Sequence, residues 1–224
     1  MSLKGVAIAF DLDGTLVETA PDLIGTLNLM LGEHGLPPVP LASARHLVGY
    51  GVRVMLEHGF AEAGAPWDPA DFPLLFERYI ELYRGRIANE SHAFEGVEAV
   101  LDQLAADGAI LLVATNKRTD LALLLLEKLN LLHHFAAVVG PDAVSRCKPD
   151  PAHLIEAIRL AGGDPGRALM VGDSENDVIP AKAAGIPVVA VSFGYTEIAA
   201  ADLGGDRLID HFDQLLRAVA ELLA

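Results

Sequence analysis

Val6-Ala7-Ile8-Ala9-Phe10-Asp11-Leu12-Asp13-Gly14-Thr15 is the stretch that decides the fold. A wholly apolar run that stops at two carboxylates and a glycine is typical of a strand buried on both faces and ended by a sharp turn. Strands buried on both faces belong to parallel sheets that helices cover on either side. The stretch therefore predicts the first strand of an α/β domain.

Similar apolar runs recur along the chain, and amphipathic helical patterns separate most of them. The further predicted strands are Ala109–Ala114, Ala136–Val139, Ala168–Val171 and Val188–Val191. The predicted helices of the same domain are Val97–Ala106, Asp120–Leu129, Pro151–Leu160, Asn176–Ala184 and Phe212–Leu223. An alternation of strands and helices indicates a Rossmann-like, doubly wound parallel sheet.

The interval 18–89 interrupts this alternation, because it contains helical patterns and turn residues but no strand-like run. Its predicted helices are Leu23–Leu31, Leu41–Val48, Val52–Glu62 and Pro69–Arg86. We therefore expect a Rossmann-like catalytic core formed by residues 1–17 and 90–224, with residues 18–89 inserted as an α-helical cap. An insertion after the first strand belongs at the carboxyl ends of the strands, where open α/β sheets bind ligands.

The charge balance and the cysteine count limit the classes of partner and compartment. The 224 residues include 31 acidic and 16 Lys or Arg residues, a net charge of −15, which argues against binding nucleic acid or an anionic membrane. A small molecule is the expected partner, and a monomer or homodimer is the expected assembly. The single cysteine, Cys147, can form no internal disulfide, and the first residues lack a secretory signal pattern, so we expect a cytoplasmic protein.

Three further segments place polar side chains just after predicted strands or before helices. They are Thr115-Asn116-Lys117, Lys148 within Cys147–Pro151, and Asp173-Ser174-Glu175-Asn176-Asp177. Each segment has an ordinary alternative: a helix cap, a solvated lysine or an acidic first helical turn, just as Asp13-Gly14 can be a simple turn. Those alternatives do not explain why all four segments fall at one edge of the sheet. Their conjunction predicts a functional site.

Converging carboxylates at this edge require a compensating charge. Asp11, Asp13 and Asp173 would repel one another by about 4 kcal/mol per pair at 4 Å in an effective dielectric near 20, so the site needs a cation or must take up protons. Carboxylates without histidine or thiolate neighbours suit a hard ion, best Mg²⁺. A metal flanked by Lys148 and Thr115 forms an anion site, for which phosphate is the natural ligand.

These residues resemble a known family. The Asp11–Thr15, Thr115-Asn116, Lys148-Pro149 and Gly172–Asp177 segments are similar, in order, to the four motifs of the haloacid dehalogenase superfamily. Further segments resemble its phosphoglycolate phosphatase branch: Leu16–Leu23, Arg45–Gly51, Thr115–Lys117 and Gly194-Tyr195. The resemblance covers nearly the whole chain. It implies a Mg²⁺-dependent phosphomonoester hydrolase for a small anionic metabolite, with 2-phosphoglycolate as the expected substrate.

The resemblance also implies a role for each catalytic residue. Asp11 attacks phosphorus and becomes an aspartyl phosphate, while Asp13 protonates the leaving alkoxide and then activates water. Thr115 and the amide of Asn116 hold phosphoryl oxygens, and Lys148 neutralises them and orients Asp11. The expected metal site comprises Asp11, the main-chain carbonyl of Asp13, and Asp173, with Asp177 orienting the metal or its water.

Substrate choice is expected to depend on the cap. Arg45 and the turn at Gly49 and Gly51 are candidates for binding a substrate carboxylate, together with Lys117. A solvated charge on a surface helix is the alternative interpretation of Arg45.

Other functions stay open at this point. Within the enzyme class they are a β-phosphoglucomutase-like phosphotransferase, a pyrophosphatase or another small-metabolite phosphatase. A receiver module that accepts a phosphoryl group without turnover is the non-enzyme alternative, and the cap and Asp13 disfavour it. Asp13 also argues against dehalogenation, which does not need an acid two residues beyond the nucleophile.

Overall fold

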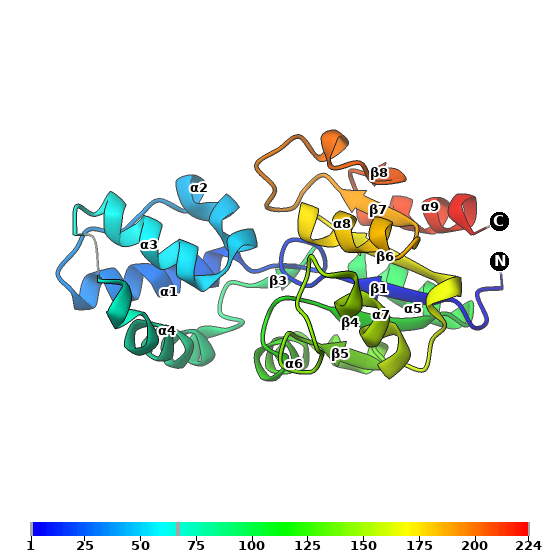
Figure 1. Cartoon of the computed structure of the whole chain (residues 1–224), viewed down its shortest axis with the longest axis horizontal. Helices are drawn as coiled ribbons and strands as arrows, with labels where there is room; N and C mark the ends of the chain where they lie inside the picture. The colour runs from blue at the N-terminus through cyan, green and yellow to red at the C-terminus, as the bar shows by residue number, and fades with distance from the viewer. Residues whose placement is uncertain (1, 66–67, 224) are drawn as a thin grey trace. The chain divides into compact units, whose positions relative to one another are not determined.

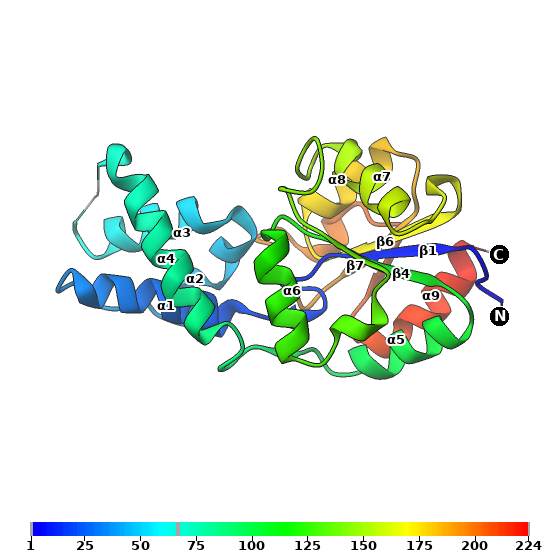
Figure 2. The same ribbon diagram turned by 90° about the horizontal axis from the view of Figure 1, so that it is seen from below.

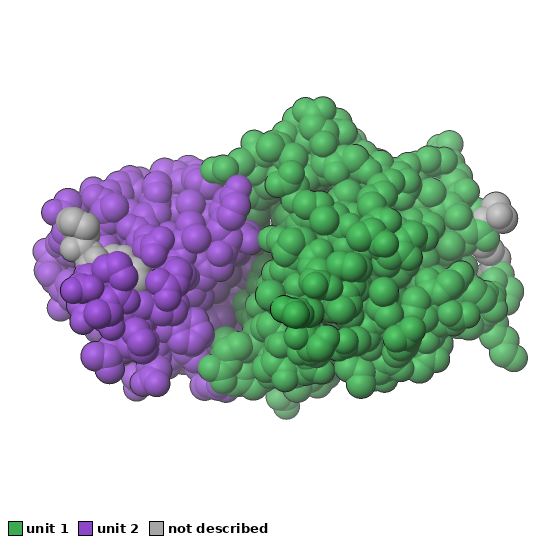
Figure 3. Space-filling view, viewed as in Figure 1, with its two compact units in different colours: residues 1–17, 93–224 green, residues 18–92 purple. Residues whose placement is uncertain are grey.

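The computed structural model describes residues 2–65 and 68–223 of the chain (Figure 1). Two compact units are distinguished: unit 1 contains Met1–Val17 and Ala93–Ala224, and unit 2 contains Glu18–His92 (Figure 3). The chain passes between the units at two short strands that pair with each other, β2 (Val17–Glu18) and β3 (His92–Ala93).

Unit 1 is built on a parallel sheet. In the described part of the chain this sheet has six strands in the order β5-β4-β1-β6-β7-β8. Its strands are β1 (Ala7–Phe10), β4 (Ile110–Ala114), β5 (Ala137–Val139), β6 (Ala168–Gly172), β7 (Val188–Val191) and β8 (Arg207–Ile209). The Rossmann-like α/β prediction is confirmed. The sequence analysis missed β8, since this short edge strand has two exposed residues of three and lacks a continuous apolar run.

Helices cover both faces of this sheet. They are α5 (Val97–Ala106), α6 (Thr119–Lys128), α7 (Pro151–Leu160), α8 (Glu175–Ala183) and α9 (Leu215–Leu222). Helices α7 and α8 lie on one face, with α5 and α9 on the other (Figure 2). The last helix was expected to begin at Phe212, but a 3₁₀ turn over Phe212–Gln214 precedes it. Pro180 lies inside α8, which remains helical on both sides of it.

The two faces of the central strand pack differently. Ala7 and Ala9 of β1 belong to a buried cluster with Leu154 and Ile158 of α7, and such small strand residues allow a helix to approach closely. On the other face Phe10 stacks on Phe212 with a centroid separation of 6.2 Å. Dense packing on both sides of β1 fixes the position at which this strand ends, and Asp11 is the next residue.

The order of the strands brings three loops together. From β1 the chain moves to β4 and β5 on one side of the sheet and then returns to β6, β7 and β8 on the other side. Phe10 pairs in register with Val113 of β4 and with Val171 of β6. The loops after β1, β4 and β6 therefore start side by side at the topological switch point, where open α/β sheets bind ligands.

Unit 2 consists of helices, as the sequence predicted for the insertion. They are α1 (Ala20–Glu33), α2 (Leu41–Ala44), α3 (Val52–Glu62) and α4 (Phe72–Arg86), with 3₁₀ helices over Arg45–Tyr50 and Pro69–Asp71. The single helix expected over Leu41–Val48 is therefore an α-helix that continues as a 3₁₀ helix from Arg45. No helix in the described ranges combines the length and apolarity needed to cross a membrane.

A buried carboxylate joins the beginning and the end of unit 2. Oδ2 of Asp22 in α1 accepts hydrogen bonds from the Glu90 N–H (2.9 Å), the Ser91 N–H (2.8 Å) and the Ser91 hydroxyl (2.7 Å). Arg86 approaches the other oxygen at 3.4 Å. The two chain segments that leave the unit are thus fastened to each other.

Candidate active site

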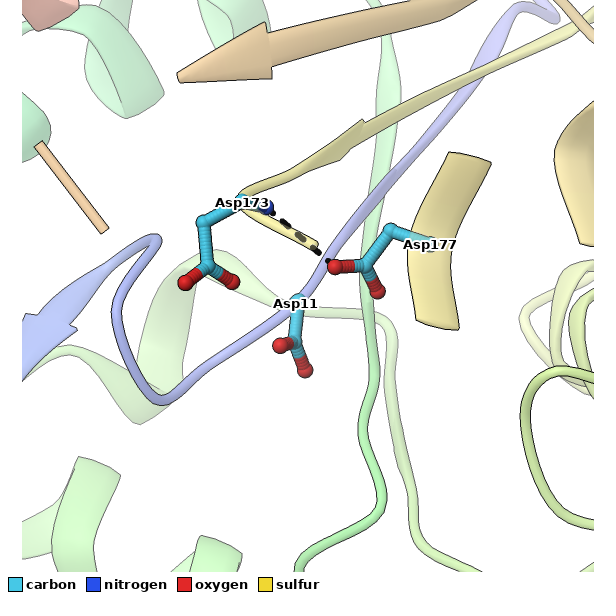
Figure 4. Close-up of side chains that lie close together, drawn as sticks. All are labelled: Asp11, Asp173 and Asp177. Carbon is cyan, nitrogen blue, oxygen red and sulfur yellow. Dashed lines mark hydrogen bonds between the residues drawn. The ribbon is translucent and has the colours of Figure 1, made fainter. Parts of the chain in front are cut away.

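Three buried carboxylates form the centre of the site (Figure 4). Asp11 follows β1, Asp173 follows β6, and Asp177 lies in the first turn of α8. Each contributes an oxygen to a group whose members all lie within 4.8 Å of one another. The expectation that these loops meet at one edge of the sheet is met for these three acids.

Asp173 is held by the loops on either side of it. The Thr15 hydroxyl donates to its Oδ1 at 3.3 Å, and the Tyr195 N–H donates to its Oδ2 at 2.7 Å. The space around it admits no further side chain, since a Cβ at Gly194 would lie 2.1 Å from the Asp173 Cβ, and one at Gly14 would lie 2.5 Å from its Oδ2. Gly14 also has φ +87°, which other residues rarely adopt. These glycines let the backbone approach the carboxylate closely.

Asp177 connects the N-terminus of α8 to Lys148. Its Oδ2 accepts hydrogen bonds from the Asp173 N–H (3.2 Å), the Ser174 N–H (3.2 Å) and the Ser174 hydroxyl (3.0 Å), which completes a capping box. Its Oδ1 accepts from Lys148 Nζ at 2.6 Å. The side chain therefore orients both the Asp173 loop and Lys148.

Lys148 is the buried cation of this cluster. Its ammonium lies 2.8 Å from Asp11 Oδ1 and 2.6 Å from Asp177 Oδ1. Burial alone would lower the pKa of this lysine, but the Asp11 and Asp177 carboxylates outweigh burial and raise the pKa above its usual value. Lys148 is therefore charged throughout the physiological range.

One lysine does not neutralise three carboxylates. Burial raises the pKa of Asp11 to about 6, partly offset by Lys148, and burial together with Asp177 and Asp11 raises the pKa of Asp173 well above its usual value. Without a further cation, the excess negative charge of the carboxylates in this buried site is unfavourable. A hard divalent cation fits this all-oxygen donor set, and Asp11, Asp173 and Asp177 could hold one.

The loop after β4 carries Thr115 and Asn116, predicted to bind phosphate, and Lys117, predicted to bind a substrate carboxylate. Thr115 is buried at the end of β4, and its hydroxyl accepts a hydrogen bond from the Lys117 N–H at 3.1 Å. The Asn116 side chain bonds to the main chain of Lys148. Lys117 Nζ lies 2.9 Å from each carboxylate oxygen of Asp13.

The side chain of Asp13 therefore has a partner that the sequence analysis did not foresee. Lys117 was expected near a substrate carboxylate, and here it holds Asp13. The charge argument expected the carboxylates of Asp11, Asp13 and Asp173 to converge, but the group that forms contains Asp177 in place of Asp13. That only the main-chain carbonyl of Asp13 contacts a metal stays a prediction.

The predicted substrate-binding residues of the cap all lie in unit 2. Arg45 Nη2 forms an ion pair with Glu18 Oε2 at 2.5 Å. Gly49 lies in the 3₁₀ helix that begins at Arg45, and Gly51, with φ +86°, separates it from α3. Arg45 is thus more than a solvated charge on a helix, but its role toward a substrate stays a prediction.

His153 was missed by the sequence analysis. It is fully buried in α7, and its Nε2 lies 3.3 Å from the Val139 carbonyl at the end of β5. Burial and the nearby Lys148 charge lower its pKa to about 4, so the ring is neutral at physiological pH. The one sequence signal that could have identified it is that a histidine occupies an apolar position in the helical pattern of α7.

A parallel sheet that gathers carboxylates, a threonine and a buried lysine at its switch point defines an α/β enzyme acting on a small anionic ligand. Comparison with known proteins identifies the family. The model of the haloacid dehalogenase-like hydrolases matches residues 8–191, and the chain belongs to that family.

Relatives of known description cover nearly the whole chain. A phosphoglycolate phosphatase of Caulobacter vibrioides is 49% identical over 99% of this chain and 93% of its own. A phosphoglycolate phosphatase of Mesorhizobium japonicum is 45% identical over 96% of this chain and 95% of its own. The crystal structure of a predicted phosphoglycolate phosphatase from Haemophilus somnus superposes with a TM-score of 0.89 at 30% identity, covering 98% of this chain and 99% of that one.

Proposed function

We propose that this protein hydrolyses 2-phosphoglycolate to glycolate and phosphate with the aid of Mg²⁺. The observation that carries the proposal is the group of three buried carboxylates at the switch point of the sheet, two of which contact Lys148. The similarity to the phosphoglycolate phosphatases of Caulobacter vibrioides and Mesorhizobium japonicum supports the choice of substrate. In this proposal the helical insertion, predicted as residues 18–89 and falling within the compact unit Glu18–His92, acts as the cap, and the α/β unit acts as the catalytic core.

Asp11 is the nucleophile in this proposal. A carboxylate oxygen of Asp11 forms a bond to phosphorus while the bond between phosphorus and the glycolate oxygen breaks, and the product is an aspartyl phosphate. Lys148, 2.8 Å from Asp11, neutralises the phosphoryl oxygens, and Thr115 with the Asn116 N–H binds them. Asp11, Asp173 and the main-chain carbonyl of Asp13 would hold Mg²⁺, which would supply charge stabilisation for phosphoryl transfer, and Asp177 would orient the surroundings of the metal.

Asp13 moves the proton in both displacements. In the first it donates a proton to the leaving glycolate oxygen, and in the second it accepts a proton from the water that attacks phosphorus and regenerates Asp11. The bonds from Lys117 suit the carboxylate form of Asp13, which is the form that accepts a proton from water. In the first displacement Asp13 must carry a proton, so the contact between Lys117 and the Asp13 carboxylate must break for that step.

Recognition of the glycolate carboxylate is assigned to the cap. Arg45, with the turn at Gly49 and Gly51, supplies the positive charge and main-chain N–H groups for this carboxylate, and Glu18 holds the guanidinium when the substrate is absent. Arg45→Ala should raise KM for 2-phosphoglycolate far more than KM for a phosphate ester without a carboxylate. Equal effects on both substrates would remove Arg45 from substrate recognition.

One assay tests the activity. Phosphate release is measured with 2-phosphoglycolate, sugar phosphates, nucleotides and pyrophosphate, with Mg²⁺ or EDTA, for the parent protein and Asp11→Asn. We expect 2-phosphoglycolate to be among the best substrates, EDTA to stop turnover, and Asp11→Asn to be inactive. A poor rate with 2-phosphoglycolate would contradict the substrate assignment, and an active Asp11→Asn variant would contradict the mechanism.

The same assay separates the alternatives. Dependence on a sugar bisphosphate would indicate a phosphomutase, preference for pyrophosphate would indicate a pyrophosphatase, and release of one phosphate per chain would indicate a receiver module. A cytoplasmic location and a monomeric or homodimeric state complete the proposal. Fractionation and light scattering test these two properties.

A further inference from the structure

The loop that carries Lys148 lies between β5 and α7 and has no regular secondary structure. Lys148 is buried, whereas its neighbours Cys147 and Pro149 are exposed. Its ammonium must nevertheless stay within hydrogen-bond distance of both Asp11 and Asp177. No strand or helix holds the main chain at this position, so another part of the molecule has to do so.

Asn116 bonds to the main chain of Lys148 at two points. Its Nδ2 donates to the Lys148 carbonyl at 3.0 Å, and its Oδ1 accepts from the Lys148 N–H at 3.1 Å, across 32 residues of sequence. A side-chain amide that pairs with both main-chain groups of one residue fixes the position and the direction of that residue. The lysine side chain then starts from a defined point.

Two other tethers hold the same loop at a distance from Lys148. Thr119 bonds to Asp142 through its N–H and its hydroxyl, both at 2.9 Å. Ser145 bonds to Glu156 of α7 through its N–H at 2.8 Å and through its hydroxyl. These contacts keep the loop folded against α6 and α7. The Asn116 bonds therefore act on the position of Lys148 and not on the fold of the whole loop.

We infer that Asn116 is a positioning residue that acts through Lys148. Its side chain holds the lysine main chain so that the ammonium stays between Asp11 and Asp177, while its N–H remains available to phosphate. This role rests on the proposed phosphatase chemistry, in which Lys148 neutralises the phosphoryl group. Small displacements of a catalytic group can cost a hundredfold in rate, so loss of the two bonds should affect the chemical step.

Asn116→Ala tests this inference, with Ser145→Ala as the matched control from another tether of the same loop. The Asn116 side chain is exposed, so its truncation leaves no cavity in the core. We expect kcat and kcat/KM of Asn116→Ala to fall together by about 10- to 100-fold, with KM and the thermal midpoint near the parent values. Ser145→Ala should stay within about threefold of the parent.

A second measurement asks whether the effect passes through the lysine. In a Lys148→Arg background, Asn116→Ala should cost less than about threefold, since the position of the lysine is already lost. The same factor in both backgrounds, or a kcat for Asn116→Ala within twofold of the parent, would overturn the inference. A rise in KM that accounts for the whole loss would also overturn it, because it would assign the side chain to substrate binding.

The variants are assayed on 2-phosphoglycolate and on p-nitrophenyl phosphate. The positioning role predicts the same variant-to-parent ratio on both esters. If the parent hydrolyses only p-nitrophenyl phosphate, the substrate assignment has failed, and the ratio on that ester still decides the role of Asn116.

Discussion

Binding of Mg²⁺ should displace a proton from the site, and the amount follows from the pKa of Asp11. Burial raises this pKa to about 6 in the metal-free protein. Because a metal requires the carboxylate form, about 0.9 proton should be released from Asp11 on binding at pH 5, but only about 0.1 proton at pH 7. The same competition should weaken the apparent Kd about tenfold between pH 7 and pH 5. The raised pKa of Asp173 adds to this effect, so tenfold is a lower bound.

Isothermal titration calorimetry of Mg²⁺ binding at the two pH values measures both quantities. Repeating each titration in buffers of different ionisation enthalpy gives the number of protons released. Asp11→Asn should lose the Asp11 contribution, whereas the control Asp202→Asn, an exposed carboxylate on a surface 3₁₀ helix, should behave as the parent. A Kd that changes less than threefold, or no proton release at pH 5, would refute the link between burial, protonation and metal binding.

Three further predictions concern other residues of unit 1, and the last of them has its control in unit 2. The pKa of His153 is about 4 in the folded protein and 6.5 in the unfolded chain. The neutral ring therefore contributes fully to stability above pH 6.5, and up to about 3 kcal/mol of this stability is lost as the pH falls toward 4. In urea unfolding at several pH values, the difference in the free energy of unfolding between the parent and His153→Leu should shrink in acid. Lys117→Met should lower kcat by about tenfold on 2-phosphoglycolate and p-nitrophenyl phosphate alike, because Asp13 loses its orienting partner; a selective rise in KM for 2-phosphoglycolate would assign Lys117 to the substrate instead. Gly194→Ala should lower kcat by more than about a hundredfold, because the new Cβ would overlap Asp173. The control is Gly32→Ala, on the exposed surface of α1, where a Cβ would meet nothing within 4 Å. It should keep full activity and raise the free energy of unfolding by about 0.5–1 kcal/mol in thermal unfolding.

Much of the fold could be predicted from local sequence patterns. The apolar runs that became β1, β4, β6 and β7 are almost wholly buried, so their composition is continuous and recognisable. The run that became the edge strand β5 was recognised as well, because it is apolar throughout even though two of its three residues are only half-buried. β8 could not be recognised in this way, because two of its three residues are exposed and Arg207 interrupts the apolar run. The change from α-helix to 3₁₀ helix at Arg45 was also hidden, since both helix types place apolar residues at similar spacing.

The site could be predicted in its members but not in its pairings. Carboxylates and a lysine that follow parallel strands must reach the same edge of the sheet, so Asp11, Asp173 and Lys148 were recognised as neighbours. Which side chain bonds to which partner depends on how the loops are oriented after the strands end. The contact between Lys117 and Asp13 joins residues 104 positions apart, and no local pattern reports it.

The sequence by itself determined where the strands end and which chemical groups stand at those ends, because apolar periodicity and turn residues act over a few positions of chain. Only the tertiary structure decided which carboxylates each lysine contacts: Lys148 lies between Asp11 and Asp177, and Lys117 contacts Asp13. This pairing follows from the order β5-β4-β1-β6, which sets the loops after these four parallel strands side by side at one edge of the sheet. Hydrogen bonds and ion pairs act over about 3 Å, so they depend on the packed positions of segments that are distant in sequence.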